Sequence, residues 1–107
     1  ENLLFDADFN LKIADFGYST SVISSQGYKN LTTIPLADSN LAPEVLLKQS
    51  YDGMTLDLFS ASIVLFMMIS GLPPFGRAEL KDPYYKLIFC GRYDNFWTVH
   101  ERGKGTV

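Results

Sequence analysis

Apolar and polar residues alternate near the start of the chain. Leu11-Lys12-Ile13 is apolar, polar, apolar, as in a half-buried strand, and residues 2–5 form a compact, mostly apolar run before it. The residues between them are Asp-Ala-Asp-Phe-Asn, and Asp and Asn favour turns because their side chains bond to nearby backbone. The pattern therefore predicts a short β-hairpin that ends at Asp15.

The stretch from residue 18 to residue 40 shows no clean period and is dominated by Ser, Thr, Gln, Gly and Asn. This composition predicts an irregular surface loop, and loops of that length are usually functional or disordered. Pro43 follows, and its missing N–H suits the first turn of a helix. We therefore expect a short helix over residues 43–48.

The longest apolar segment covers residues 56–69, where apolar side chains lie almost all round a helix. A helix of this kind is buried on most faces, so we expect it at the centre of its domain. Residues 50–55, which include Gly53, are expected to form the turn before it. Gly71 is a suitable helix end, and Pro73-Pro74 forbids continuation.

A further helix is predicted at Asp82-Pro83, because Asp is a good N-cap and Pro suits the first helical position. It covers residues 84–89 and ends at Gly91. Phe96 and Trp97 are expected to anchor the chain before the polar tail at 101–105. The expected fold is mainly α, with a short β-hairpin at the start.

Aromatic residues on and after this helix have two readings. Tyr84 and Tyr85, together with Phe96 and Trp97, could form a docking surface, since exposed aromatic side chains often mark interfaces. Partial burial against the rest of the domain is the favoured alternative. His100 stands alone in the sequence, and we expect it to be a packing or surface residue rather than a ligand.

Composition limits the class of protein. The 107 residues are enough for one small domain, and 47% are hydrophobic, which excludes a disordered polar tail. The net charge is −3 with no basic block, so we expect no nucleic acid partner and no membrane partner. The apolar stretch at residues 61–69 is broken by Ser62 and is too short to span a bilayer.

Cysteine usage and the first residues bear on location. Cys90 is the only cysteine, which excludes an internal disulfide and a Cys-based metal site. A single free thiol fits a reducing compartment. The chain starts with Glu1 and shows no basic segment before an apolar run, as a signal peptide would. A cytoplasmic location is expected.

Four landmarks occur in a fixed order along the chain. Asp15-Phe16-Gly17 and Ala42-Pro43-Glu44 bracket a stretch rich in Ser and Thr, as the two ends of a protein-kinase activation segment do. Glu1-Asn2-Leu3-Leu4 is similar to the end of a kinase catalytic loop. Asp57 opens an apolar helix that is followed by residues 70–75, Ser-Gly-Leu-Pro-Pro-Phe. In this order, the landmarks resemble the middle of a protein kinase catalytic domain of the Ser/Thr type.

The resemblance implies a partial kinase domain over residues 1–107, part of the C-terminal lobe of a protein-kinase-like α+β fold. The activation segment would be residues 15–44, and the central helix would cover about 55–70. The Gly-rich phosphate loop and the Val-Ala-Ile-Lys strand are missing from the sequence. The catalytic base of the family would lie upstream of Glu1, so no catalytic residue is visible.

The resemblance also assigns a metal and nucleotide site. In kinases the Asp of Asp-Phe-Gly and the Asn that ends the catalytic loop hold Mg²⁺, and these positions match Asp15 and Asn2. Their oxygen donors suit Mg²⁺, and the hairpin would bring both to one edge. Phe16 would pack inward, while Gly17 would give the backbone freedom to switch.

Three apolar residues match the positions that bind or support the adenine ring of ATP in the family. Leu4 would lie under the ring, and Val64 and Met68 of the central helix would support it. Simple core packing is the alternative for all three. Both interpretations hold together, because the floor of a kinase adenine pocket is part of the core.

The far end of the activation segment would be anchored by Ala42, Pro43 and Glu44. In the family this Glu pairs with an Arg near the end of the domain, and no matching Arg is present. Asp57 matches the Asp that holds the catalytic loop through backbone N–H bonds. The alternative for both acids is a helix first turn, where the helix dipole favours negative charge.

Thr33 matches the main activation-loop phosphorylation position of the family. Phosphorylation there would add nearly two negative charges and order the segment against an Arg upstream of Glu1. Simple solvation of the hydroxyl is the alternative. Residues 33–41 would contact a protein substrate near its phosphoacceptor.

The chain departs from the family pattern at several positions. Residues 36–40 are Leu-Ala-Asp-Ser-Asn where the family commonly has Gly-Thr, two variable residues and Tyr. Ala37 replaces a hydroxyl that helps fix the catalytic Asp, and Asn40 replaces a packing Tyr. Phe59 stands where Trp is usual, and Ser62 where Gly is usual.

The main interpretation is a fragment of a Ser/Thr kinase, most similar to the calcium/calmodulin-dependent type. The parent protein would transfer the γ-phosphate of ATP to protein hydroxyls, with ATP and Mg²⁺ as cofactors. The isolated chain would be inactive, because it lacks the N-terminal lobe and the rest of the C-terminal lobe. A pseudokinase or scaffold lobe, favoured by Leu36, Ala37 and Asn40, and a truncated non-functional product are the alternatives.

Overall fold

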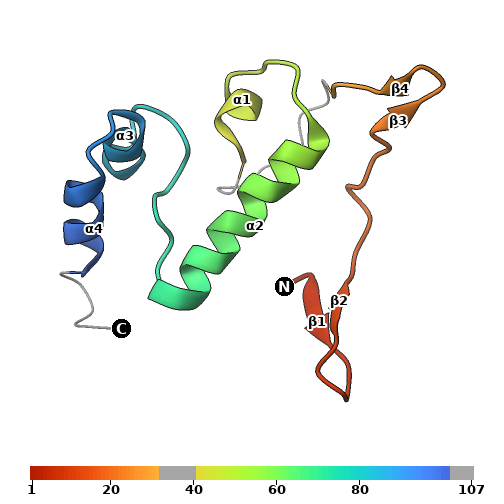
Figure 1. Cartoon of the computed structure of the whole chain (residues 1–107), viewed down its shortest axis with the longest axis horizontal. Coiled ribbons are helices and arrows are strands. Elements are labelled where there is room, and N and C mark those ends of the chain that lie inside the picture. The colour runs from red at the N-terminus through yellow and green to blue at the C-terminus, as the bar shows by residue number, and fades with distance from the viewer. Residues whose placement is uncertain (32–40, 102–107) are drawn as a thin grey trace.

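The computed structural model describes residues 1–31 and 41–101. Thr33, the segment 36–40 and the polar tail from residue 102 lie outside the described residues. Within these described ranges, four short strands and four helices follow one another (Figure 1). Their bounds are β1 Leu3–Phe5, β2 Leu11–Ile13, β3 Ile23–Ser24, β4 Gly27–Tyr28, α1 Pro43–Leu46, α2 Gly53–Ser70, α3 Pro83–Phe89 and α4 Tyr93–Glu101. The expected fold class, mostly helical with a short hairpin at the start, is confirmed.

The first hairpin is formed by β1 and β2, which pair antiparallel with Leu3 opposite Ile13 and Phe5 opposite Leu11. Asp6 N–H donates to the carbonyl of Asn10, so the turn lies where Asp and Asn predict it. The strands stay exposed on both faces, and the side chain of Ile13 is 67% exposed. The hairpin is therefore held by its turn and its backbone ladder rather than by burial.

A second hairpin, β3–β4, corrects the expectation of an irregular loop after residue 18. Ser24 and Gly27 face each other across its turn, and Lys29 N–H donates to the carbonyl of Val22 at 2.9 Å. The Ser24 hydroxyl accepts from Gln26 N–H and donates to the Gly27 carbonyl, and Gly27 has a φ of 101°. Strands of two residues are too short to show a period of two, so turn chemistry alone signals this hairpin.

Helix α2 begins earlier than expected, because Gly53 is its first residue and not part of a turn. Asp52 is the N-cap: its Oδ1 accepts from Met54 N–H at 3.0 Å, and its Oδ2 from the hydroxyl of Thr55. The helix ends as predicted at Gly71, which has a φ of 77° and donates to the carbonyl of Met67. The Asp52 cap therefore sets the start of α2, although the apolar run that predicted the helix begins only at residue 56.

The burial predicted for α2 is wrong for this chain. Only Gly53 and Ile63 of the helix are buried, and Met68 is 74% exposed. Its 18 residues have a mean hydropathy of 1.7, and among the described helices it alone is long and apolar enough to cross a membrane. Core helices of soluble domains meet the same requirement.

Two small cores lie along α2. One contains Ala42, Val45 and Tyr51, and the other contains Ile63, Phe75 and Ala78. Phe59 packs against both and therefore connects them. Helix α1 is shorter than the predicted 43–48, since the chain leaves the helix after Leu46.

Helix α3 starts at the predicted place, with Asp82 as N-cap and Pro83 as the first residue. Helix α4 was not predicted, because only two anchoring aromatic residues were read from its sequence. Phe96 is buried at 3% exposure and packs with its ring 5.8 Å from that of Phe66 on α2. This contact packs α4 against α2 and so stabilises a helix that the sequence pattern of residues 93–101 predicts only weakly.

The aromatic residues differ in their burial: Tyr84 and Trp97 are exposed, at 46% and 53%, whereas Tyr85 is not. The ring of Tyr85 lies 5.3 Å from that of Phe75 and is half-buried, which confirms the favoured reading for this residue. His100 is a packing residue, as expected, but it is not isolated. Its Nδ1 lies 2.8 Å from the Phe96 carbonyl and its Nε2 lies 2.8 Å from the Pro74 carbonyl.

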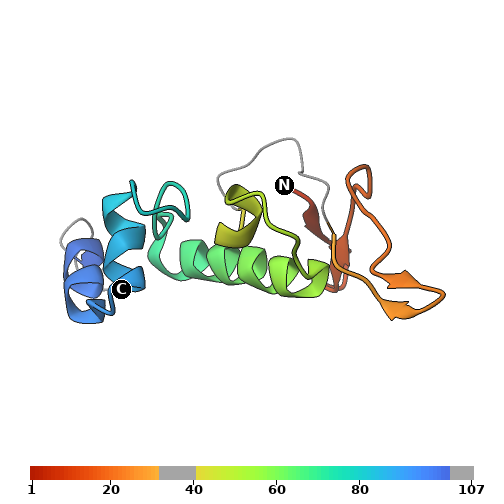
Figure 2. The ribbon, with the colours of Figure 1, turned by 90° about the horizontal axis from the view of Figure 1, so that it is seen from above.

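The molecule is elongated (Figure 2). Its radius of gyration is 16.1 Å, whereas a compact domain of this length has about 13 Å. In this extended arrangement, apolar side chains on the first hairpin and on α2 stay exposed. This surface has the character expected of a lobe that packs against further parts of a larger domain.

Candidate nucleotide and magnesium site

Asn2 and Asp15 lie at the open end of the first hairpin. The last strand pair joins Leu3 to Ile13, and beyond it Ala14 N–H donates to the carbonyl of Asn2 at 2.9 Å. Asp15 is the next residue, so two residues thirteen positions apart come to one edge. The arrangement agrees with the predicted metal site, whose role as a Mg²⁺ site stays a prediction.

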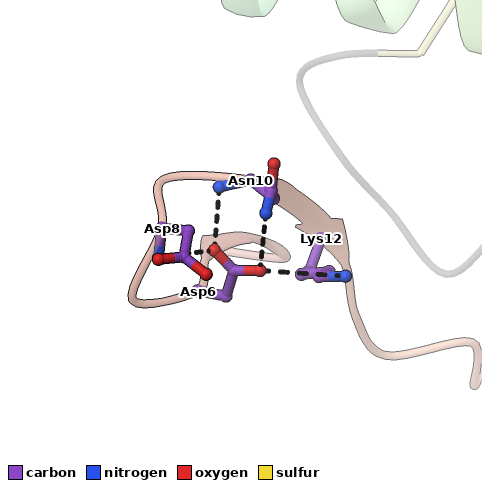
Figure 3. Close-up of polar contacts among 4 residues, drawn as sticks. All are labelled: Asp6, Asp8, Asn10 and Lys12. Atoms are coloured by element: carbon purple, nitrogen blue, oxygen red, sulfur yellow. Dashed lines mark hydrogen bonds and ion pairs between the residues drawn. The ribbon is translucent and has the colours of Figure 1, made fainter.

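The turn at the opposite end of the hairpin is organised by Asp6 (Figure 3). Its Oδ1 accepts from Asp8 N–H and Asn10 N–H, both at 2.9 Å, and its Oδ2 accepts from the side-chain amide of Asn10 at 3.1 Å. Lys12 Nζ lies 3.9 Å from the same oxygen. These contacts fix the pairing register, and a slip of one residue would move Asp15 away from Asn2.

The same contacts set the ionisation of Asp6. The backbone N–H of Asn10, followed by the Asn10 side-chain amide, lowers the pKa of the Asp6 carboxyl below its ordinary value of 3.8. Hydrogen bonds to a carboxylate favour its charged form. Asp6 therefore stays charged and keeps its donors throughout the neutral range.

Asp15 has a backbone conformation that most residues avoid. Its φ is 65°, in the left-handed region, which Asp tolerates better than most residues. Its Oδ1 accepts from Gly17 N–H at 3.2 Å, and a Cβ at Gly17 would lie 3.2 Å from that oxygen. Strained dihedral angles of this kind concentrate at functional sites.

The donor set at this edge fits Mg²⁺. Mg²⁺ takes oxygen ligands and is commonly held by one or two protein side chains together with substrate phosphates and water. Asn2 and Asp15 are both exposed and supply one amide oxygen and one carboxylate. In residues 1–31 and 41–101 no cluster of three or more His, Cys, Asp or Glu residues could hold a metal by itself. Asn2 and Asp15 would therefore need further oxygen ligands, such as phosphate and water, to complete a Mg²⁺ site.

The residues expected to contact or support adenine are divided between the first hairpin and α2. Leu4 on β1 is 51% exposed, Val64 is half-buried and Met68 is exposed on α2. Figure 1 shows the first hairpin standing apart from α2. The shared role of Leu4, Val64 and Met68 at the adenine ring stays a prediction for the larger domain.

The inward packing expected of Phe16 is not seen. Its side chain is 67% exposed, because no other described element covers the hairpin edge. The Phe16 carbonyl instead accepts from the backbone and the hydroxyl of Ser19, which turns the chain after Gly17.

Of the two ends of the predicted activation segment, the Ala42-Pro43-Glu44 end is the better anchored. Ala42 is 1% exposed in the first core and precedes Pro43, the first residue of α1. Glu44 lies near Tyr85: burial raises the pKa of the Tyr85 hydroxyl above 10.0, and the charge of Glu44 adds to the rise. Among the described residues, Glu44 forms no ion pair with a basic side chain.

Asp57 lies in the second turn of α2 and is exposed. Its predicted role, holding the catalytic loop, is untested by the contacts of this chain. Because α2 begins at Gly53, the alternative that placed Asp57 in the first turn of the helix is wrong, and Asp52 provides the helix cap. Sequence reasoning missed Asp52 because it took residues 50–55 as a turn.

Comparison with known proteins places the chain in a family. The family model of the protein kinase domain matches residues 1–100. The chain belongs to the protein kinase family. It is 43% identical over 93 residues to CBL-interacting serine/threonine-protein kinase 26 of Arabidopsis thaliana, which is 87% of this chain and 21% of that protein.

Other kinases of the same type are also similar. CBL-interacting serine/threonine-protein kinase 24 of Arabidopsis thaliana is 39% identical over 87 residues, and CBL-interacting protein kinase 11 of Oryza sativa subsp. japonica is 37% identical over 97 residues. These matches cover 81% and 87% of the chain and 19% of each relative. The chain thus spans about a fifth of the length of these kinases and corresponds to a fragment of a Ser/Thr kinase.

Proposed function

We propose that the protein to which this chain belongs transfers the γ-phosphate of ATP to Ser or Thr hydroxyls of proteins. The observation that carries the proposal is the hairpin that brings Asn2 beside Asp15, in a chain of the kinase family. When bound, Mg²⁺ would neutralise the phosphate charge that develops during transfer. Asp15 and Asn2 would hold the metal, and Leu4 would contact adenine.

The proposed activity belongs to the larger protein. This chain provides no Gly-rich loop over the phosphates and no general base, and Leu4 and Met68 remain exposed. We expect the purified 107-residue chain to show no ATP turnover. Clear turnover by that chain would contradict this part of the proposal.

Several finer features are supported only by sequence. The Pro-Pro turn and its flanks favour a calcium/calmodulin-dependent-like kinase, and the single thiol Cys90 favours the cytoplasm. Thr33 is the proposed regulatory phosphosite, and protein substrates are the proposed partners.

A phosphotransfer assay on the intact protein tests the function. We expect Mg²⁺-dependent phosphorylation of Ser/Thr peptides, and a loss of roughly 100-fold or more in Asp15→Asn, since the metal ligand loses its charge. Asp8→Asn is the matched control, because Asp8 lies in the hairpin turn and its carboxylate holds none of the described contacts. Equal activity of Asp15→Asn and Asp8→Asn would contradict the assignment.

A scaffold lobe is the second candidate function. Ala37 and Asn40, which replace a hydroxyl and a packing Tyr of the family pattern, favour it. Binding of Mg²⁺ and ATP separates the two candidates. A protein that binds neither but retains protein partners would be a scaffold.

A further inference from the structure

At the start of α2, Gly53 has no side chain, and residues of the activation segment pack in the space that a side chain would take. Gly53 is buried, and a Cβ built on it would lie 2.8 Å from Val22 Cγ1 and 2.9 Å from Leu31 Cδ1. Its φ lies outside the left-handed region, so glycine is not required there by backbone conformation. The requirement is therefore one of space.

Backbone bonds hold the segment at the same place. Leu31 N–H donates to the Tyr51 carbonyl at 2.7 Å, and Tyr51 N–H donates to the Leu31 carbonyl at 2.9 Å. Figures 1 and 2 both show the chain after β4 reaching the N-terminal end of α2. The bridge joins residues that are twenty positions apart, and Tyr51 lies two residues before Gly53.

The rest of this region is also fixed. Tyr51 is 6% exposed and belongs to the first core, against which Leu31 packs. Asp52 caps α2 and so holds Gly53 and Tyr51 in place. On the other side, Val22 closes the base of the β3–β4 hairpin through its carbonyl bond to Lys29 N–H.

We infer that Gly53 is a positioning residue for the activation segment, because only glycine leaves room for Val22 and Leu31 to pack against the start of α2. We call this contact of Val22 and Leu31 with Gly53 the seat. The seat gives the segment a fixed point between the Asp15-Phe16-Gly17 turn and the start of α1. Its effect on binding of protein substrates rests on the proposed kinase function. The seat itself does not.

Substitution of Gly53 by Ala would close the seat. Leu31 Cδ1 is the end of a flexible side chain and can move, but Val22 is β-branched and stiff at χ1. Contacts under 3 Å between carbons are strongly repulsive, so Val22 and the hairpin base would be displaced. The Leu31–Tyr51 bridge would open more often.

Amide hydrogen exchange in the intact protein is the test. In Gly53→Ala we expect about tenfold faster exchange at the amides of Lys29, Leu31 and Tyr51, with no change at Phe96 on α4. The double variant Val22→Ala/Gly53→Ala removes the clashing methyl and should restore slow exchange. Equal acceleration at Leu31 and Phe96, or no acceleration at Leu31, would overturn the inference.

Gly91→Ala is the matched control. Gly91 has a φ of 73° with open space around it, so Ala there costs backbone strain without a clash. The amides of Leu31 and Tyr51 should exchange in this variant as in the unaltered protein. Faster exchange there would show that any destabilising Gly→Ala change releases the segment, and it would overturn the inference.

A kinetic measurement connects the seat to the proposed function. In Gly53→Ala we expect the KM for a peptide substrate to rise about threefold while the KM for ATP stays unchanged, with recovery in the double variant. A rise in the KM for ATP alone would overturn the positioning role. Absence of activity in the unaltered protein would overturn the proposed function, while the exchange pattern would still decide the seat.

Discussion

The carboxylate of Asp82 accepts a hydrogen bond at 2.8 Å from the backbone N–H of Gly76, six residues upstream. The same Oδ2 accepts from Arg77 N–H, and Oδ1 accepts from the N–H groups of Tyr84 and Tyr85. One side chain thus caps α3 and also fixes the turn after Phe75. A Cβ at Gly76 would lie 2.9 Å from Oδ2, so the glycine is part of this arrangement.

Removal of this carboxylate should destabilise the C-terminal half of the chain. We expect Asp82→Ala to lower the free energy of unfolding by about 1–2 kcal/mol, the upper part of the range for loss of an N-cap, because the turn at Gly76 also loses its acceptor. Urea unfolding followed by Trp97 fluorescence measures it. Asp94→Asn is the control, since no described residue bonds to the Asp94 carboxylate, and an equal loss there would contradict the prediction.

Asp82 should also make stability depend on pH. Partial burial acts to raise its pKa, but four backbone N–H bonds outweigh burial and hold the pKa below the ordinary value of 3.8. A carboxyl whose folded pKa is depressed stabilises the fold above the unfolded pKa, and this contribution is lost as the pH falls through the folded pKa. The difference in unfolding free energy between the unaltered protein and Asp82→Asn should therefore be constant from pH 7 to about 5 and shrink below about pH 4. A difference that grows on acidification would contradict it.

Sequence reasoning succeeded where local chemistry acts alone. Asp6 and Asn10 predicted the first turn, Asp82-Pro83 predicted α3, and Gly71 predicted the end of α2. The meeting of Asn2 and Asp15 followed from the hairpin.

The failures have physical causes in tertiary context. Helix α4 depends on packing between Phe66 and Phe96, which are thirty residues apart. The seat at Gly53 depends on Val22, and no local pattern connects the two. The predicted burial of α2 and Phe16 is too high, because no described part of this chain covers Phe16 or most of α2.

The hairpin turn should influence the metal site at its other end. Asp6→Ala removes the acceptor of Asp8 N–H and Asn10 N–H, so the register that places Asn2 beside Asp15 loosens. In the intact protein we expect the KM for Mg²⁺-ATP to rise by about three- to tenfold, because the misplaced ligands bind less tightly. Asp6→Asn retains an acceptor oxygen and should show a smaller rise. An unchanged KM in Asp6→Ala would show that the rest of the domain sets the register.

Phe59 should contribute more to the stability of the fold than its partial exposure suggests. It packs on both cores, and its ring lies 6.3 Å from that of Phe75. Phe59→Ala would leave a cavity at their junction, and we expect a loss of about 2–3 kcal/mol, below the range for fully buried Phe because the site is half-buried. Ser62→Ala on the same helix is the control, since its hydroxyl bonds only to the helix carbonyl of Leu58. A loss in Phe59→Ala no larger than in this control would show that the two cores are stable independently of each other.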